Sequence, residues 1–515
     1  MSGILQPLLA SLQPSLDLST TAMITLYLLT GIVTALCYNL LRRSKLDHIP
    51  TIGYSSPILS YISALRFFRH GRAIIEEGYR LYPNQVWKLA TLEEWFIVAN
   101  GTSRVEDISK APDYQLDNSL SFAAYLQLDY TLGPEVTSNP YHVNVVRAAM
   151  TRNIMAQFDE MHDEMLQAFA DVLPLNASNG NWVGLPIFET IVEVMSRISA
   201  RLSVGFPLCD NKEFRAICNR SGAAITNGRM LRFFPKVLKQ LASKVFLSAH
   251  TDLEALSKLL RPVIEFRLEQ ESLHGNHWPG KPNDLLTWML EEAGRLGIER
   301  TSLDMATRIY FLAFASHTSS TMFMCALHEI ATRPEYLQPL RDEVQGVIDR
   351  EGWTKGAISK LYKMDSFFRE IQRCYDMQLL HLGRKVMKDF VFSDGTVVPA
   401  GYTLYVNSHG SHHDEQLYPS PGNFDGFRFV REDSLEQPLM AKPTLDYNPF
   451  GYGKHACPGR FSAAYQLKTM LAHVIMTYDL KSEDGTHLSS TTCVEAGFNP
   501  NVEAKLYFRR RSELA

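Results

Sequence analysis

The stretch that decides the fold class is FGYGKHACPGR, residues 450–460, near the C-terminus. It places a single thiol, Cys457, between glycines on one side and Pro-Gly on the other. Pro458 suits the first position of a helix, and the following FSAAYQLKTMLAHVIMTY has helical periodicity. We therefore expect Cys457 at a helix N-terminus, where unpaired N–H groups and the helix dipole favour an anion and lower the pKa of the thiol.

The turn around this thiol is lined by glycines. Gly451, Gly453 and Gly459 keep side chains away from the sulfur, so a flat, bulky partner can approach it. Zinc and iron–sulfur clusters need several Cys or His ligands at short spacings, and none accompanies Cys457. A lone thiolate in a glycine-lined turn fits haem iron instead, because the macrocycle supplies the four equatorial ligands.

The composition describes a large globular protein. The chain has 515 residues, of which 45% are hydrophobic and 21% charged, and its net charge of −4 gives no indication of nucleic acid as a partner. Its seven cysteines are scattered without a CxxC pair, which favours a reducing compartment over a disulfide framework.

The N-terminus predicts a membrane anchor. Residues 20–41 carry no charge and are long enough, as a helix, to span a bilayer. Arg42, Arg43 and Lys45 follow at once, which places the rest of the chain on the cytosolic side. We therefore expect an anchor over residues 1–45, with a single transmembrane helix at about 20–41, and one catalytic domain over 46–515. Pro50, Gly53 and Pro57 predict a short hinge between the two.

The remainder of the chain is expected to be mainly α-helical. Apolar residues at three- and four-residue spacing predict helices within 192–204, 252–273 and 282–297, and a long helix over about 302–332 that crosses the middle of the domain. After about Leu379 the run RKVMKDFVFSDGTVVPAGYTLYVNS predicts short strands with turns between them. The expected fold class is mainly α with a small β-rich region late in the chain.

A family resemblance joins these observations. The residues that carry it are Phe450, Gly451, Gly453, His455, Cys457 and Gly459, which together resemble the haem-binding loop of the cytochrome P-450 monooxygenases. The resemblance implies the cytochrome P-450 fold, haem b as cofactor and Cys457 as axial ligand of its iron. The chain is most similar to fungal microsomal members of secondary metabolism, such as ent-kaurene oxidase-like enzymes.

FFREIQR, residues 367–373, places Glu370 and Arg373 one helical turn apart. Such a pair alone is weak evidence, but PSPGNFDGFRF provides Arg428 where the family has a second arginine. The resemblance implies that Glu370, Arg373 and Arg428 form a buried structural network behind the haem.

The haem propionates need cationic partners. By resemblance these are His455 and Arg384, together with Arg147 in NPYHVNVVRAAMTR. The family often has a tryptophan four residues before this arginine, whereas Val143 stands here, and His142 is a further candidate.

The long helix contains FLAFASHTSST, where family members usually carry two small residues, an acid and a threonine. Here Phe314 replaces the first small residue and His317 replaces the acid. Thr318 can donate a hydrogen bond to dioxygen or position a water. His317 either shuttles protons, since its ordinary pKa is near 6.5, or fills space and bonds a backbone carbonyl; the sequence leaves both open.

Phe311, Phe314, Ala315 and Thr318 form one stripe on this helix, at i, i+3, i+4 and i+7. We expect part of the stripe to line the substrate pocket, which suggests an apolar substrate.

The expected activity is oxygen insertion into a lipophilic molecule such as a terpenoid, at the endoplasmic reticulum membrane. No Gly-rich dinucleotide fingerprint is evident, so NADPH is expected to act through a separate membrane-bound NADPH–cytochrome P-450 reductase. Lys454, Arg460 and Lys468 are candidates for its docking face. The sequence leaves two other functions open: a haem carrier or sensor, and a haem-thiolate isomerase or dehydratase that needs no NADPH.

Overall fold

The computed structural model describes residues 45–511 except 57, 154–155, 174, 176–179, 432–435, 484–491 and 500, together with 23, 26–27, 29–31, 33–34 and 37–38. The predicted transmembrane segment, about 20–41, lies largely outside the described residues. Within the described part of the chain, no helix combines the length and the apolar character needed to cross a bilayer.

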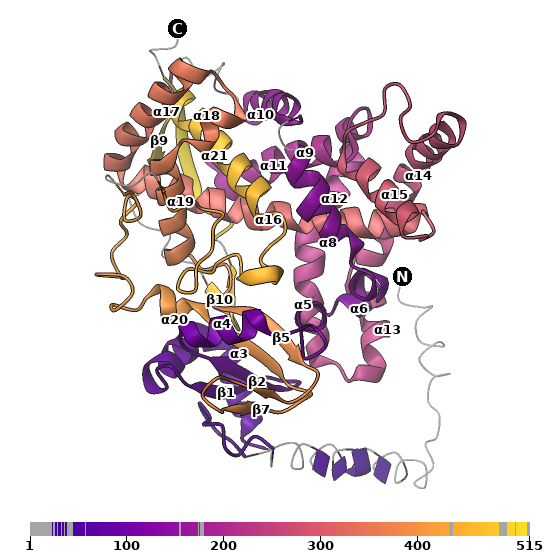
Figure 1. The fold of residues 1–515 in the computed structure, drawn as a ribbon, viewed down its shortest axis with the longest axis vertical. Helices are drawn as coiled ribbons and strands as arrows, with labels where there is room; N and C mark the ends of the chain where they lie inside the picture. The colour runs from indigo at the N-terminus through magenta and orange to yellow at the C-terminus, as the bar shows by residue number, and fades with distance from the viewer. Residues whose placement is uncertain are drawn as a thin grey trace, which may run out of the picture.

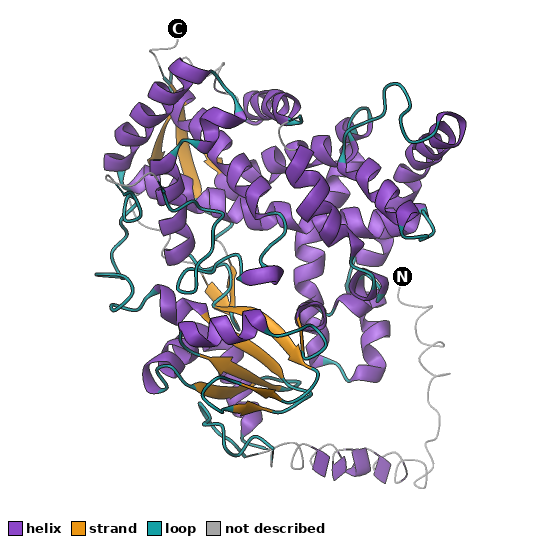
Figure 2. Cartoon of the chain, in the orientation of Figure 1, coloured by secondary structure: helices purple, strands orange, loops and turns teal. Residues whose placement is uncertain are grey.

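Helices dominate the body, and strands collect mainly at one end of it (Figures 1 and 2). The longer helices are α3 (Ser60–Leu81), α4 (Thr102–Lys110), α5 (Asn118–Leu126), α10 (Phe158–Val172), α11 (Ile187–Val204), α12 (Lys212–Asn227), α13 (Lys236–Phe246), α14 (Ala249–His274), α15 (Leu285–Arg295), α16 (Ser302–Thr332), α17 (Leu337–Glu351), α19 (Tyr362–Cys374) and α21 (Arg460–Thr477). Shorter helical segments include α6 (Leu128–Thr131), α7 (Glu135–Ser138), α8 (Tyr141–Val145), α9 (Thr151–Asn153), α18 (Lys355–Ser359) and α20 (Ser408–His412). The predicted helices within 192–204, 252–273 and 282–297 are confirmed.

The predicted central helix is confirmed as α16, which begins at Ser302 and ends at Thr332. Thr301 caps its N-terminus by accepting a hydrogen bond from the Asp304 N–H at 3.1 Å. Residues 305–310 are buried in a core that α16 shares with α12, α14 and α15. Residues 320–330 are buried, most of them in a second core with α10, α11, α19 and α21. Between these cores, residues 311–319 are all at least partly exposed.

The main sheet joins distant parts of the chain. Its strand order is β1 (Val86–Ala90), β2 (Trp95–Ala99), β8 (Thr403–Asn407), β5 (Leu380–Val386) and β3 (Leu116–Asp117). The late strands agree with the sequence prediction, and so does the small hairpin of β6 (Phe390–Val391) and β7 (Val397–Val398). The sequence prediction did not include the early hairpin β1–β2, whose strand β2 pairs with β8 in parallel.

Two smaller sheets complete the β structure. One contains β4 (Val183–Pro186), β12 (Lys505–Arg510) and β9 (Tyr478–Ser482), and the other is the hairpin of β10 (Thr492–Val494) and β11 (Gly497–Asn499).

The predicted hinge is attached to the body. The backbone N–H of Ile52 donates to Lys88 O at 3.0 Å, and the Lys88 N–H donates to Pro50 O at 2.8 Å. Leu46 and Ile49 are buried beside the sheet. The chain from Leu46 to Ile52 therefore extends the edge of the sheet rather than forming a free connection, because its apolar side chains gain by burial.

Candidate active site

Cys457 lies in a turn held by backbone hydrogen bonds. Its N–H donates to Phe450 O at 2.7 Å, and the N–H of Gly451 donates to Asn448 O at 2.8 Å. Gly451 and Gly453 have φ values of +73° and +71°, a left-handed conformation that favours glycine. Gly459 has φ −87°, a backbone conformation that any residue can adopt. A Cβ atom at this position would lie 3.7 Å from the Val146 side chain, an ordinary contact distance, so neither the backbone nor the described neighbours require a glycine here.

The helix after the cysteine begins later than the sequence predicts. α21 starts at Arg460 rather than at Pro458, so Cys457 precedes it by a short turn. Burial raises the pKa of the Cys457 thiol above its usual value, while hydrogen bonds from the backbone N–H groups of Gly459 and Arg460 lower it. The expected lowering of the thiol pKa was therefore wrong for the protein alone, because the cost of desolvating a thiolate exceeds the stabilisation by these N–H groups.

The structure brings Glu370, Arg373 and Arg428 into one network. Arg373 donates to both carboxylate oxygens of Glu370, at 2.8 and 2.7 Å, and the Nε of Arg428 lies 3.2 and 3.1 Å from the same two oxygens. The side chains of Glu370 and Arg373 are fully buried. The backbone N–H of Asp425 adds a further donor to Glu370 at 3.0 Å. The carboxylate thus fastens α19 to the segment 419–428.

The donors left over in this network bond backbone carbonyls. Arg373 Nη1 donates to His412 O at 2.8 Å, and Arg428 donates to Pro419 O and Asn423 O. Charge-assisted bonds of this kind are strong and directional, so they position the loops that they join.

Thr318 is exposed in the accessible middle of α16, and Ala315 is exposed one turn before it. The Thr318 hydroxyl donates to the Ala315 carbonyl at 2.9 Å, and the hydroxyls of Ser320 and Thr321 donate to the Ser316 and His317 carbonyls. Because the Thr318 hydrogen is engaged in this bond, its oxygen is left to accept a hydrogen bond from water.

His317 lies on another side of α16. Its Nε2 donates to the Asn219 carbonyl of α12 at 2.6 Å, and its ring packs where a side chain at Gly222 would clash. Burial lowers the pKa of His317, so the imidazole is neutral at neutral pH. This arrangement corresponds to the second reading of the sequence, in which His317 fills space and bonds a carbonyl.

The predicted propionate partners lie around the cysteine turn. Arg147 donates to Lys454 O at 3.0 Å, and His455 lies next to that residue in the chain. Arg384 is 2% exposed, and its described partners are neutral groups, Asn118 Oδ1 at 2.7 Å and Gly383 O at 2.9 Å. Burial lowers the pKa of Arg384 to about 10.

Two residues near this set have roles that the sequence did not indicate. Asp113 accepts from His455 Nε2 at 2.6 Å and from Lys454 Nζ at 2.8 Å. His142 is buried against Arg308 of α16, with its Nδ1 2.9 Å from Arg308 Nη1, and burial lowers its pKa to about 3. The spacing of neither residue could reveal these contacts, because each partner is distant in the sequence.

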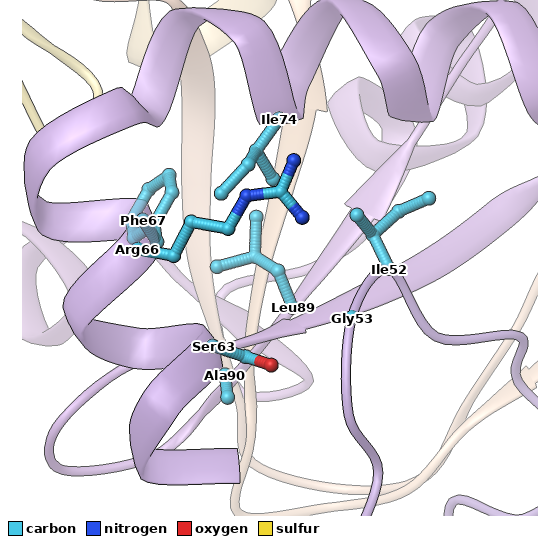
Figure 3. Close-up of a pocket in the computed structure, with 8 residues that line it drawn as sticks. All are labelled: Ile52, Gly53, Ser63, Arg66, Phe67, Ile74, Leu89 and Ala90. Atoms are coloured by element: carbon cyan, nitrogen blue, oxygen red, sulfur yellow. The ribbon is translucent and has the colours of Figure 1, made fainter. Parts of the chain in front are cut away.

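A small hollow elsewhere in the fold has no part in this site. It lies between α3 and β1 and is lined mainly by apolar side chains, among them Phe67, Ile74 and Leu89, with the Arg66 side chain extending across it (Figure 3). None of its lining residues belongs to the predicted site.

The residues around Cys457 fit a haem group. The thiol is the single soft ligand of the turn, two backbone N–H groups point at its sulfur, and left-handed glycines shape the loop. The buried Arg384 guanidinium donates hydrogen bonds only to neutral groups among the described residues. A carboxylate such as a haem propionate would therefore complement its charge and offset the free-energy cost of burying it.

The family model described as Cytochrome P450 matches residues 83–506, most of the chain. The chain belongs to the cytochrome P450 family. It is 35% identical over 491 residues to cytochrome P450 monooxygenase 151 of Postia placenta, covering 94% of this chain and 98% of that protein. It is 32% identical to cytochrome P450 monooxygenase CYP512U6 of Ganoderma lucidum, covering 85% and 86% of the two chains, and 29% identical to ent-kaurene oxidase of Gibberella intermedia, covering 92% and 90%.

As a cytochrome P450 monooxygenase, the protein is an enzyme whose haem has a thiolate ligand, and Cys457 is the residue that the sequence predicts for that role. When bound, the haem supplies the chemistry of dioxygen activation. The chain contributes position and protons: Arg384 offers a buried positive charge, and Thr318 holds a hydroxyl in the accessible stretch of α16. The roles of these individual residues remain predictions, which the following variants test.

We expect Glu370→Gln to destabilise the folded enzyme by about 3–5 kcal/mol, because it removes the charge that two buried or half-buried guanidinium groups share. Denaturant unfolding monitored by circular dichroism measures the loss. Glu415→Gln, an exposed glutamate in the segment between α20 and Arg428, is the matched control, with an expected change under about 0.5 kcal/mol. Equal stability of the two variants would contradict the structural role of Glu370.

We expect Thr318→Ala to raise the hydrogen peroxide released per NADPH consumed by about tenfold, the equivalent of one lost hydrogen bond. His317→Gln should leave this ratio unchanged, since glutamine can still donate to the Asn219 carbonyl while it cannot carry a proton. Peroxide and NADPH assays on the reductase-coupled enzyme measure both. Uncoupling by His317→Gln would assign proton delivery to His317 after all.

Proposed function

We propose that this cytochrome P450 inserts one atom of dioxygen into a large lipophilic substrate, a terpenoid or a related secondary metabolite. Electrons come from NADPH through a separate membrane-bound reductase. The observation that carries the proposal is the exposed stretch of α16 between two buried ends, since it presents apolar side chains beside the Thr318 hydroxyl.

The apolar character of this stretch supports a lipophilic substrate. Phe311 is partly exposed and meets the ring of Phe122 of α5 edge to face, with centroids 6.1 Å apart. Phe122 is itself 37% exposed, and Ala315 lies one turn further along α16. Aromatic rings with accessible faces gain most by covering apolar surface, as a terpenoid skeleton provides.

The relatives support the substrate class. One of them is named ent-kaurene oxidase, and the similarity covers most of both chains. At 29% identity the pocket residues of two enzymes differ, so we extend only the class of substrate, a bulky hydrocarbon skeleton, to this protein.

A basic face for the reductase has fewer residues than the sequence suggests. Lys468 is 4% exposed, and its ammonium bonds the Asp365 carboxylate at 2.5 Å, so it cannot dock a partner. The side chain of Lys454 is 45% exposed, although it pairs with Asp113. Arg460 is partly exposed and donates to Cys457 O at 2.8 Å. We propose that Lys454 and Arg460 mark the docking face, beside the cysteine turn.

The proposal includes attachment to the endoplasmic reticulum membrane through residues 20–41, with the catalytic domain on the cytosolic face. An exposed apolar surface supports it. On α13, Val237, Leu241 and Val245 are 87%, 63% and 65% exposed and lie on one side of the helix. On α3, the first helix after the anchor, Ile62 and Leu65 are 53% and 52% exposed.

These two helices belong to one region of the molecule. Phe233, which precedes α13, packs edge to face on Phe68 of α3, with ring centroids 5.5 Å apart. Figure 1 shows both helices in the lower part of the view. Exposed apolar patches of this kind mark surfaces that meet a membrane or a partner.

We expect removal of residues 1–45 to leave part of the protein bound to phospholipid vesicles. The double variant Leu241→Ser, Val245→Ser in this shortened protein should bind at least about tenfold more weakly, because each apolar side chain contributes about 1.5–3 kcal/mol on burial. Vesicle co-sedimentation measures the change. Lys258→Ser, an exposed polar position on α14, is the control, and equal binding of the double variant and this control would contradict the membrane role of α13.

We expect co-expression with a fungal reductase and feeding of terpenoid hydrocarbons to give a product heavier by one oxygen atom, detected by mass spectrometry. Cys457→Ala should abolish this product together with the red-shifted Soret band of the reduced carbon monoxide complex, since no other ligand in the turn replaces the thiolate.

Two outcomes would replace the proposal by another function. Turnover without NADPH would identify an isomerase or dehydratase. A normal Soret band with no substrate-dependent NADPH consumption, across the terpenoids fed, would favour a carrier or sensor.

A further inference from the structure

A cluster of histidines and carboxylates lies outside the residues assigned to the reaction. It joins Glu76 of α3, Asp376 in the segment between α19 and β5, and two residues of the α20 region, His409 and His413. Figure 1 shows α20 beside α3 at the edge of the main sheet. We propose that Asp376, His409 and His413 bind a divalent transition-metal ion, Zn²⁺ being the ion that this donor set favours, while Glu76 orients His409.

The donor atoms are already close together. One ligand atom each of Asp376, His409 and His413 lies within 4.8 Å of the others. The Glu76 Oε1 lies 3.0 Å from His409 Nε2, the ring nitrogen opposite the one that faces Asp376, so Glu76 orients the His409 ring and is not itself a ligand. Ligand atoms about 2.0–2.2 Å from a tetrahedral zinc are roughly 3.3 Å apart, so side-chain shifts of about 1 Å complete the site.

Neighbouring bonds orient the ligands. The Nδ1 of His413 lies 2.9 Å from the His409 carbonyl, which can only accept, so this nitrogen carries the proton and Nε2 keeps its lone pair. Asp376 Oδ1 accepts from His412 Nδ1 at 2.7 Å, and both side chains are fully buried. Such outer bonds fix metal ligands in direction and raise metal affinity.

The charges of the cluster favour a cation. Two carboxylates, Asp376 and Glu76, face the two ring nitrogens of His409. Arg72, 3.5 Å from Glu76, opposes the cation at the exposed side, and Arg373 is the other basic group whose charge acts on His413. The ion takes the place of the proton on His409 Nδ1, the nitrogen that faces Asp376, and this proton is released to solvent while the Nε2–H group stays bonded to Glu76.

Access comes from the α3 side. Asp376 and His409 are 0% and 1% exposed, whereas the Glu76 side chain is 54% exposed and His413 is partly exposed. Imidazole and carboxylate donors together suit zinc, which needs no redox chemistry to remain bound. The ion would fasten the α20 region to the segment between α19 and β5 that contains Asp376.

The test is equilibrium dialysis of the chelator-treated, haem-loaded full-length enzyme against micromolar Zn²⁺, with zinc and iron counted by mass spectrometry. We expect one zinc per haem iron in the wild type. His413→Gln and Glu76→Gln, both at accessible positions, should bind zinc at least tenfold more weakly. His274→Gln, at the last residue of α14, and His277→Gln, just beyond it, change exposed histidines; they serve as matched controls and should bind as the wild type does.

Zinc-edge X-ray absorption of the wild type gives a readout that depends on no variant. We expect a first shell of nitrogen and oxygen with the multiple-scattering pattern of two imidazoles. Absence of micromolar zinc binding to the wild type, wild-type affinity in His413→Gln or in Glu76→Gln, or a shell of sulfur ligands would each overturn the proposal.

Discussion

The interaction on which the architecture depends is the sharing of one buried carboxylate, Glu370, by two arginines. A carboxylate with no access to water is tolerated only when its oxygens are fully hydrogen-bonded, and here Arg373, Arg428 and the Asp425 N–H provide the donors. Because these donors come from α19 and from the segment 419–428, the network fixes the part of the chain that leads to the cysteine turn. Arg373 also bonds the carbonyl of His412, whose ring in turn donates to Asp376. The structural network and the proposed zinc site are thus adjacent and are connected through His412.

The second constraint is the placement of α16. Its two ends are buried in different cores, so the helix cannot slide or rotate without disturbing both. Between the two cores, residues 311–319 are accessible, and there apolar rings, Ala315 and the Thr318 hydroxyl are displayed together. His317 shows how one residue can be chemically suggestive and yet be used for packing: its imidazole binds α12 to α16 through the Asn219 carbonyl. On α16, therefore, the side of the helix on which a residue lies decides whether it faces the accessible region, as Thr318 does, or packs against another helix, as His317 does.

The sequence was most informative where the signal is local. The periodicity of residues 302–332 predicted α16 to the residue, and the spacing of Glu370 and Arg373 on one helical face led to a network that the structure indeed forms.

The sequence prediction failed where a contact joins distant segments of the chain. Residues 86–99 were not recognised as strands because one of them, β2, pairs with β8, which is distant in the sequence. Lys468 looked like a surface lysine until its partner Asp365, on another helix, was known. The pKa of Cys457 depended on how deeply the turn is buried, which spacing does not reveal. The roles assigned to Arg147, Arg384 and His455 stay predictions.

The parallel pairing of β2 with β8 has a consequence for how the protein is made. About 300 residues separate the two strands, and a ribosome adds roughly 5–20 residues per second. After the first hairpin leaves the exit tunnel, one edge of it therefore waits for roughly 15–60 seconds before its neighbour exists. During that interval the backbone groups along β2 present an open template to any other extended chain. During synthesis, chaperones must therefore cover the open edge of β2. A shortage of chaperones should lower the yield of folded protein, whereas the molecules that do fold should have an unchanged active site.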